Sequence, residues 1–480
     1  MNALNPPVWN KLRSRAAPGR AARGGAALVL LLLTLLPAAA EELRPLDLNA
    51  FLALVERNSL QLENVRTDRA LAETQEKLVR SQIYPMIGAR AGYTRNFLDI
   101  EQQFPVAADA TQEIPGSFLG LDPGRNYYPL ATRAIDVNRD NEFSLGLSVQ
   151  QKLFDMSVFR ALEASRQFTD LTGTIYEASR HEILTAAKRL FFQALLLQEV
   201  LDVRRSSREI AHDNYRATQR RLDSGLASPL ELLRAEVNWK ITEPETSQAE
   251  RNLNVVLQNL RTFAGIPQGE SIQLEGSLDR YPPLPSFEGA FAARADRPDY
   301  RALLGERRLR ELNVGAERAK FFPTLAASLT YGWQTADDGF DLGNGTDVLT
   351  AGLTMTIPIF YGGSRFVQLE QAQLELRRTN TTIALQEESI TTELETIRLT
   401  LEEAHLRIGS ARQTMTTAER AYQVSETSLE SGLATQLELK DARVSLEQAR
   451  LNYLSAVFDY LHAYFDWQLA TGRGDQGLQW

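Results

Sequence analysis

The residue types that most often carry catalysis are sparse in this 480-residue chain and lie far apart. The absence of cysteine excludes disulfides, thiolate metal sites and a cysteine nucleophile. No serine lies in the context of a nucleophile elbow, and no His-Glu-x-x-His pattern places two histidines on one helical face. The four isolated histidines are His181, His212, His405 and His462. This pattern predicts a protein that is not an enzyme and that has no catalytic or metal site.

One segment formally matches a nucleotide-binding pattern. Residues 472–477 read Gly-Arg-Gly-Asp-Gln-Gly, which fits G-x-G-x-x-G. In dinucleotide-binding folds this motif follows a strand and opens a helix, whose N-terminal amides bind the phosphates. Here the motif follows a predicted helix at the end of the sequence, and no helical pattern comes after it. We therefore expect no bound nucleotide and no other cofactor.

The first 40 residues differ in composition from the rest. Five basic residues precede an apolar run over 26–36, and three alanines at 38–40 provide a small-residue cleavage site. We interpret residues 1–40 as a cleaved secretory signal peptide, because the run is short for a membrane anchor. Without this segment the formal net charge falls from −9 to −14. An acidic exported protein is a poor candidate for binding nucleic acid.

Apolar residues at heptad spacing fill most of residues 389–467. They recur at alternating intervals of four and three as far as Tyr422, and again from Leu439 onward. Sustained spacing of this kind predicts long helices packed as in a coiled coil. Between them Gly432 lies in Ser-Gly-Leu-Ala-Thr, a turn that folds one helix back on the other. Gly225 lies in the matching turn Ser-Gly-Leu-Ala-Ser, so we expect two helical hairpins.

Four other segments alternate apolar and polar side chains, as strands with one apolar face do. Each is about ten residues long, the length of a tilted strand that crosses a bilayer. A soluble sandwich is the alternative, but the polar face is small and largely uncharged. Four strands cannot close a barrel alone, and an open edge is not viable in lipid, so we expect a barrel shared between chains. The predicted strands span about 84–96, 142–154, 322–335 and 347–361.

The two halves of the chain repeat one order of predicted elements: helix, strand, loop, strand, long helix, glycine turn and helix. At a constant offset Glu163 matches Glu370 and Tyr215 matches Tyr422. The loop over 97–141 is rich in proline and glycine, and we expect it to be irregular. We divide the chain into a signal peptide (1–40), a first repeat (41–264), a linker (265–298), a second repeat (299–470) and a C-terminal tail (471–480).

In these features the chain resembles the TolC-like outer membrane efflux protein family, over nearly all of the sequence after the signal peptide. The resemblance rests on the paired repeats, the strand pairs ending at 152–154 and 357–363, and the two glycine turns followed by Leu-Glu-Leu. It implies a mainly helical homotrimer. Four strands per chain would close a 12-stranded barrel in outer membrane lipid, and the hairpins would continue it as a periplasmic α-barrel.

The function that the resemblance implies is a passive exit duct of a tripartite efflux or type I secretion system. Its expected partners are a periplasmic adaptor (membrane fusion) protein, which opens the duct by docking at the helical tips, and an inner-membrane pump or ABC transporter. The expected docking residues are Gly225, Leu226, Gly432 and Leu433. Inward carboxylates would form rings of three that favour cations, although a solvated helix face is the ordinary alternative. The candidates are Glu438, Asp441 and Glu231.

The sequence also departs from the family pattern. Leu429 and Ala434 stand where the family often has a tyrosine and an arginine at its constriction, so the same gating bonds are not expected. Arg234 occupies the place in the first hairpin that Asp441 occupies in the second. Pro244 falls inside the return helix of the first hairpin and predicts a kink or break there.

The alternative function is a periplasmic coiled-coil scaffold or adaptor that never enters the membrane. Heptad-spaced hairpins alone fit that function equally well. The four strands of membrane length, with aromatic residues near their ends, favour the duct because a scaffold has no use for them.

Overall fold

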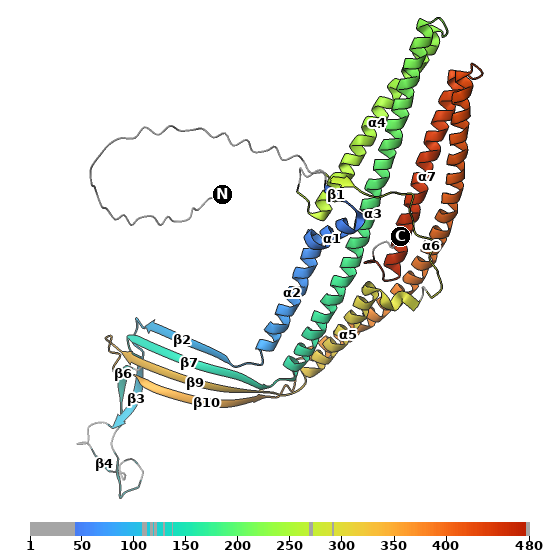
Figure 1. The fold of residues 1–480 in the computed structure, drawn as a ribbon. Helices are drawn as coiled ribbons and strands as arrows, with labels where there is room; N and C mark the ends of the chain where they lie inside the picture. Colours follow the sequence, from blue (N-terminus) through green and yellow to red (C-terminus); the bar gives the residue numbers. More distant parts are fainter. Residues whose placement is uncertain are drawn as a thin grey trace, which may run out of the picture. The chain divides into compact units, whose positions relative to one another are not determined.

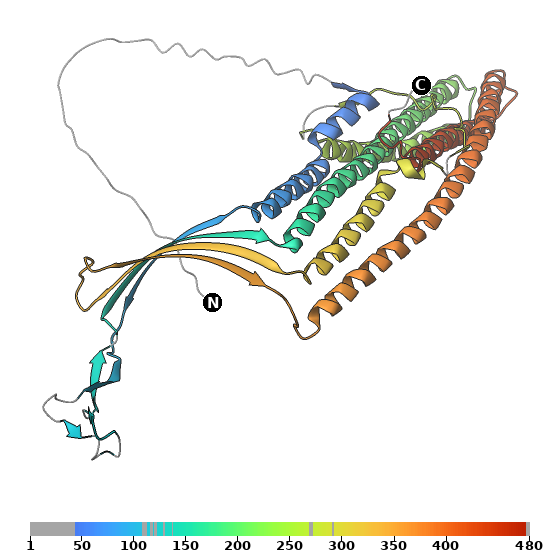
Figure 2. The same ribbon diagram turned by 90° about the horizontal axis from the view of Figure 1, so that it is seen from below.

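The computed structural model joins one four-stranded sheet to a set of long helices (Figures 1 and 2). The predicted signal peptide lies outside the residues that the structure describes. Those residues are 44–107, 113–115, 119, 122–127, 130–136, 138–267, 272–289 and 292–476.

The first half of the chain runs from a short strand through two helices into the sheet, and then into two long helices. Its main elements are β1 (Arg44–Leu46), α1 (Leu48–Asn58), α2 (Leu60–Ser81), β2 (Met86–Arg95), β7 (Asn141–Phe154), α3 (Met156–Asp223) and α4 (Pro229–Ala264). The second half has the same order around its own two strands. Its elements are β8 (Ile272–Leu274), the 3₁₀ helix η1 (Ala292–Asp296), α5 (Pro298–Ala319), β9 (Thr324–Asp337), β10 (Thr346–Thr356), α6 (Ser364–Glu430) and α7 (Gln436–Ala470).

The sheet has the order β10-β9-β7-β2, and all three ladders are antiparallel. Small residues line its centre, where Gly146 of β7 pairs with both Arg90 and Gly332. The prediction that the last strand reaches residue 361 was wrong. β10 ends at Thr356, because Pro358 has no N–H to donate to a ladder.

The segment between β2 and β7 is more regular than predicted. It forms one ladder between β3 (Glu101–Ala107) and β6 (Leu130–Asp136). A second, two-residue ladder joins β4 (Ile114–Pro115) to β5 (Asn126–Tyr127). The base of this extension is tied to the other inter-strand loop. Asn141 is buried and donates to the carbonyl of Gly339 at 2.7 Å, and Arg139 pairs with Asp338 at 2.9 Å.

Both predicted hairpins are present in the structure. α3 and α6 contain 68 and 67 residues, and they pack on α4 and α7 respectively. A kink or break was predicted at Pro244, and there is no break: α4 continues as one helix from Pro229 to Ala264. Packing against α3 on both sides of the proline supports that stretch of helix. Trp239 stacks on Tyr215, and the Thr246 hydroxyl lies 3.4 Å from the carbonyl of Arg204.

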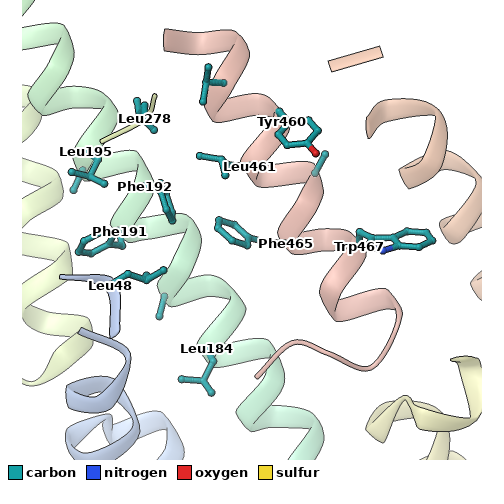
Figure 3. Close-up of a cluster of buried hydrophobic side chains, with 14 of the residues drawn as sticks. Leu48, Leu184, Phe191, Phe192, Leu195, Leu278, Tyr460, Leu461, Phe465 and Trp467 are labelled. Atoms are coloured by element: carbon teal, nitrogen blue, oxygen red, sulfur yellow. The ribbon is translucent and has the colours of Figure 1, made fainter. Parts of the chain in front are cut away.

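The main apolar core lies where α3, α7 and α1 meet (Figure 3). Phe192 of α3 faces Phe465 of α7, with ring centroids 5.4 Å apart, and Phe191 stacks on Phe51 of α1. The hydroxyl of buried Tyr460 donates to the carbonyl of Pro282, which fixes the linker to α7. Within the described residues, no helix combines the length and the apolarity that crossing a membrane requires.

Candidate functional site

The two hairpin tips have the same backbone geometry. Gly225 and Gly432 each have φ of +74°, a left-handed conformation that glycine adopts without steric cost. The N–H of Leu226 donates to the carbonyl of Arg221 at 2.7 Å, and the N–H of Leu433 donates to the carbonyl of Ser428 at 2.8 Å. These bonds satisfy carbonyl groups at the end of the outgoing helix, as in a Schellman motif.

Each return helix begins with a capping box. At the first tip the N–H of Glu231 donates to the Ser228 hydroxyl, and the Glu231 carboxylate accepts from the Ser228 N–H at 3.2 Å. At the second tip Thr435 and Glu438 form the same pair, with the carboxylate 2.7 Å from the Thr435 N–H. Two of the three predicted lumen carboxylates therefore bond to the start of their own helix.

The predicted docking residues lie at the ends of the hairpins. Leu226 is 71% exposed and Leu433 is 85% exposed, whereas a leucine after a C-cap glycine usually packs against the preceding turn. Asp441 is exposed on α7, one turn beyond the capping box. Leu429, at the place of the family's constriction residues, is half-buried, and its carbonyl accepts from the N–H of Gly432.

A polar cluster that the sequence analysis missed joins the two hairpins about three to six turns from the tips. We call Arg204 and Ser207 of α3, together with Arg443 and Glu447 of α7, the hairpin clamp. The Glu447 carboxylate accepts from the Ser207 hydroxyl at 2.6 Å and lies 3.6 Å from Arg443. Arg204 also pairs with Glu447, and Arg443 donates to Ser207. The side chains of Glu447 and Arg443 are 11% and 12% exposed.

The clamp combines two cations, one carboxylate and one hydroxyl in a nearly buried place. Arg204 has a further carboxylate partner in Glu245 of α4, at 3.0 Å. Nearer the tips Gln436 of α7 extends the contact, accepting from Asn214 at 2.8 Å and donating to Thr218 at 3.2 Å. These bonds bridge positions more than 200 residues apart in the sequence, so heptad spacing alone could not indicate them.

A groove lies between α4 and α7 on the same part of the hairpins. Two cavities of about 440 and 230 Å³ share Asn238 and Lys440 in their walls. The larger cavity is lined by the exposed apolar side chains of Leu233, Val237 and Leu437 and by the two cations Arg234 and Lys440. The groove is therefore apolar along its floor and carries two cations beside it.

No chemical centre accompanies these features in the part of the chain that the structure describes. No group of three or more His, Asp and Glu side chains there is arranged to hold a metal ion. The four histidines pack against an aromatic ring or a single carboxylate; the pairs are His181–Asp475, His212–Trp239, His405–Tyr460 and His462–Asp466.

This combination of one four-stranded sheet and two long hairpins is the fold of outer membrane channel subunits. The chain shares it with the CmeC outer membrane channel of Campylobacter jejuni, with a TM-score of 0.69 and 17% identity over 89% of this chain and 86% of that one. The chain belongs to the outer membrane efflux protein family, whose profile matches residues 52–266 and 291–473. The resemblance noted from the sequence is therefore confirmed.

Two curated relatives show how far the similarity extends. The chain is 20% identical over 301 residues to the alkaline protease secretion protein AprF of Pseudomonas aeruginosa. It is 24% identical over 285 residues to the cobalt-zinc-cadmium resistance protein CzcC of Cupriavidus metallidurans. The matches cover 62% and 59% of this chain, and they span 62% and 66% of the lengths of those relatives.

Proposed function

We propose that the chain is one subunit of a passive exit duct, which crosses the outer membrane with its strands and the periplasm with its helices. The observation that carries the proposal is that sheet and helices stand in the same order. β2 follows α2, β7 leads into α3, β9 follows α5, and β10 leads into α6. α3 packs on α2 and α5, and α5 packs on α6 (Figure 2). The helices therefore lie in the order α2-α3-α5-α6, which matches the order β2-β7-β9-β10 of the strands to which they are connected.

The wall so formed has two open edges. β2 and α2 make one edge, and β10 and α6 make the other. Because β10 and β2 run in opposite directions, β10 of one copy can pair with β2 of the next in an antiparallel ladder. Unpaired strand edges are not viable in lipid, which supports closure by further copies. Three copies, the number that the family resemblance implies, would give 12 strands.

The helical edges carry exposed apolar rows that support the same closure. On each helix the exposed residues are separated by intervals of about 7, 11 or 14 residues, which keep them on one face as in coiled coils. Exposing such an apolar row to water is unfavourable, and covering it with a neighbouring helix lowers the free energy. The row on α2 comprises Leu60, Leu71 and Leu78; the row on α6 comprises Leu374, Leu385, Leu399 and Leu406.

A periplasmic adaptor would dock at the tips. Leu226 and Leu433 offer apolar anchors there, and the α4–α7 groove offers an apolar floor beside Arg234 and Lys440. A helical hairpin with an apolar stripe and flanking carboxylates would match this surface. Gly225 and Gly432 would contribute by holding the turns that present the leucines.

Opening would separate the two hairpins, so the hairpin clamp would have to release. Its buried Glu447 holds α7 to α3, and separation would leave Arg204 without that carboxylate and Ser207 without Glu447 and Arg443. Asp441 is exposed on α7, nearer the tip than the clamp. One such carboxylate from each of three chains would form a ring that favours cations. Glu231 and Glu438 would act first as helix caps and second as charges at the mouth.

The duct itself would perform no chemistry, and an inner-membrane pump or ABC transporter would supply the energy. One relative is named for protease secretion and another for metal resistance. The cargo would therefore be selected by the partner pump and not by a binding site in this chain.

Membrane fractionation tests the proposal against a soluble periplasmic scaffold. The mature chain is expected in the outer membrane fraction and should resist alkaline, detergent-free extraction, because its strands would be integrated in lipid. A chain that is released into the soluble fraction by that treatment would contradict the duct.

A further inference from the structure

The two places where a strand gives way to a long helix differ. β7 passes into α3 through the single residue Asp155, whose carboxylate accepts from the N–H of Ser157 at 3.0 Å. β10 is followed instead by seven residues, Ile357–Gly363, before α6 begins. Gly362 and Gly363 have φ of +61° and +81°, so this junction segment turns sharply just before the helix. The second half of the chain therefore has a separate segment at the level where strands meet helices.

The apolar side chains of the junction segment are highly exposed. Ile359 is 88% exposed and Phe360 is 75% exposed. Ile359 also continues a row of exposed side chains that begins on β10, because it lies an even number of residues after each of them. That row consists of Leu349, Leu353 and Met355 of β10 and Ile357 of the junction segment. The face that β10 would turn toward lipid thus extends beyond the sheet.

Arg365 holds the junction segment in this position. Its guanidinium group donates to the carbonyls of Ile359 at 3.1 Å and Lys320 at 3.4 Å. It also lies over the rings of Tyr361 and Phe321, 5.2 and 4.9 Å from their centroids. Within the part of the chain that the structure describes, no carboxylate forms an ion pair with Arg365. The group is a fixed cation, with N–H groups to spare, beside an exposed apolar segment.

We propose that the junction segment is a membrane anchor, which inserts Ile359 and Phe360 into the phospholipid leaflet at the periplasmic surface while Arg365 binds a headgroup phosphate. Aromatic residues favour this interface, and a guanidinium group matches phosphate geometry. The proposal rests on the membrane-spanning role proposed for the strands. The anchor would fix the start of α6, the helix that leads to the second tip, at the membrane surface.

Single cysteines test the anchor cleanly, because the native chain has none. Ile359→Cys, Leu353→Cys and Leu433→Cys would each carry a nitroxide spin label, in the full mature chain reconstituted into phosphatidylethanolamine–phosphatidylglycerol vesicles. Electron paramagnetic resonance would measure collisions with oxygen, which enriches in lipid, and with a water-soluble nickel chelate. All three side chains are more than 70% exposed, so labelling should not disturb packing.

The label at 353 is expected to lie deepest in lipid. The label at 359 is expected to be shallower, but its collisions with oxygen should still be several-fold more frequent than those of the label at 433. If the label at 353 lies in lipid but the label at 359 collides with the nickel chelate as often as the label at 433 does, the anchor is overturned. Protection of 359 from both reagents would also overturn it, by showing protein cover from a second copy. Water exposure at both 353 and 359 would overturn the membrane role of the strands together with the anchor.

The phosphate contact has its own test. The depth of the 359 label would be compared in phosphatidylglycerol vesicles and in galactolipid vesicles, which lack phosphate. The native chain should hold the label deeper in the phosphatidylglycerol vesicles, and Arg365→Gln should abolish that difference, whereas Arg365→Lys should retain part of it. A difference that persists in full in Arg365→Gln would overturn the assignment of Arg365.

Discussion

The two hairpins agree closely at their tips and differ at their roots. Both tips turn through a glycine with φ of +74° and restart with a capping box. At the roots, α3 continues β7 after one residue, whereas α6 begins seven residues after β10. Charge differs too, because Arg234 in the first hairpin stands where Asp441 stands in the second.

This contrast separates local from long-range control of structure. A tip needs a left-handed residue, a cap and an apolar residue, and a short run of sequence supplies all three. A root depends on what lies beside the strand: β7 is paired on both sides and keeps its ladder as far as Phe154, whereas β10 is an edge strand and stops at Thr356. Substitutions can therefore break either the equivalence of the tips or the contacts that hold the two hairpins together.

The largest effect is expected from the hairpin clamp. Glu447→Ala leaves Arg204 and Arg443 without their shared carboxylate in a nearly buried site, which should destabilise the folded chain by about 3 kcal/mol. Thermal unfolding in detergent measures the loss. The matched control is Glu245→Ala, which removes an exposed partner of the same Arg204 and should cost roughly 0–1 kcal/mol. Equal losses in the two variants would show that the clamp does not join the hairpins energetically.

An effect of pH on stability, similar in size, is expected where α3 contacts the end of the second half of the chain. Buried Lys188 of α3 donates to Gln468 and to the carbonyls of Gly474 and Gln476, and burial lowers its pKa to about 8. Between pH 8 and 10.5 the unfolded chain binds this proton and the folded chain does not, so stability should rise with pH by roughly 3 kcal/mol.

Lys188→Met should remove that rise, because the variant has no proton to lose at this site. Denaturation midpoints at pH 7, 8, 9 and 10 would measure the slope in both proteins. A slope that is the same in both would show that Lys188 does not titrate as its burial predicts.

Alanine at the two tip glycines should cost the same. Gly225→Ala and Gly432→Ala each force a left-handed conformation on alanine, at about 1–2 kcal/mol, and no atom lies within 4 Å of the added methyl group at either place. Gly409→Ala, in the middle of α6 with equally open surroundings, should instead stabilise by about 1 kcal/mol. Unequal costs at the two tips would break their equivalence and point to a contact that one tip alone makes.

The capping boxes should give the smallest of these effects. Ser228→Ala and Thr435→Ala each remove one hydroxyl acceptor at the start of a return helix, at about 1 kcal/mol. Unfolding measurements on the two variants should agree within error. A loss at one tip alone would mean that the matching hydrogen bonds do not have matching strengths.

Much of the fold could be predicted from the sequence because its signals are local and repeated. Two-residue alternation indicated the four strands of the main sheet, heptad spacing indicated the second hairpin, and the matching glycine turn at Gly225 indicated the first. The capping boxes at Ser228–Glu231 and Thr435–Glu438 also follow a readable pattern, a hydroxyl residue followed three positions later by glutamate. That signal could have assigned these two carboxylates to helix caps before any lumen role was considered.

Other features depend on neighbours that the sequence does not reveal. Ile359 and Tyr361 keep the alternation of β10, so the pattern could not show where pairing stops. The hairpin clamp joins Arg204 to Glu447 across 243 positions, and on each helix alone these residues look like solvated charges. At Pro244 the local rule predicted a kink or break, but the helix continues through the proline, where packing against α3 supports it.

The central claim is that copies of this chain close at their two open edges. The most direct measurement is the mass of the purified mature chain in detergent, determined by light scattering with the detergent contribution subtracted. The account predicts a particle of three chains, because β10 and α6 of each copy would cover β2 and α2 of the next. A monodisperse, folded single chain would contradict it, since both edges would then be left uncovered.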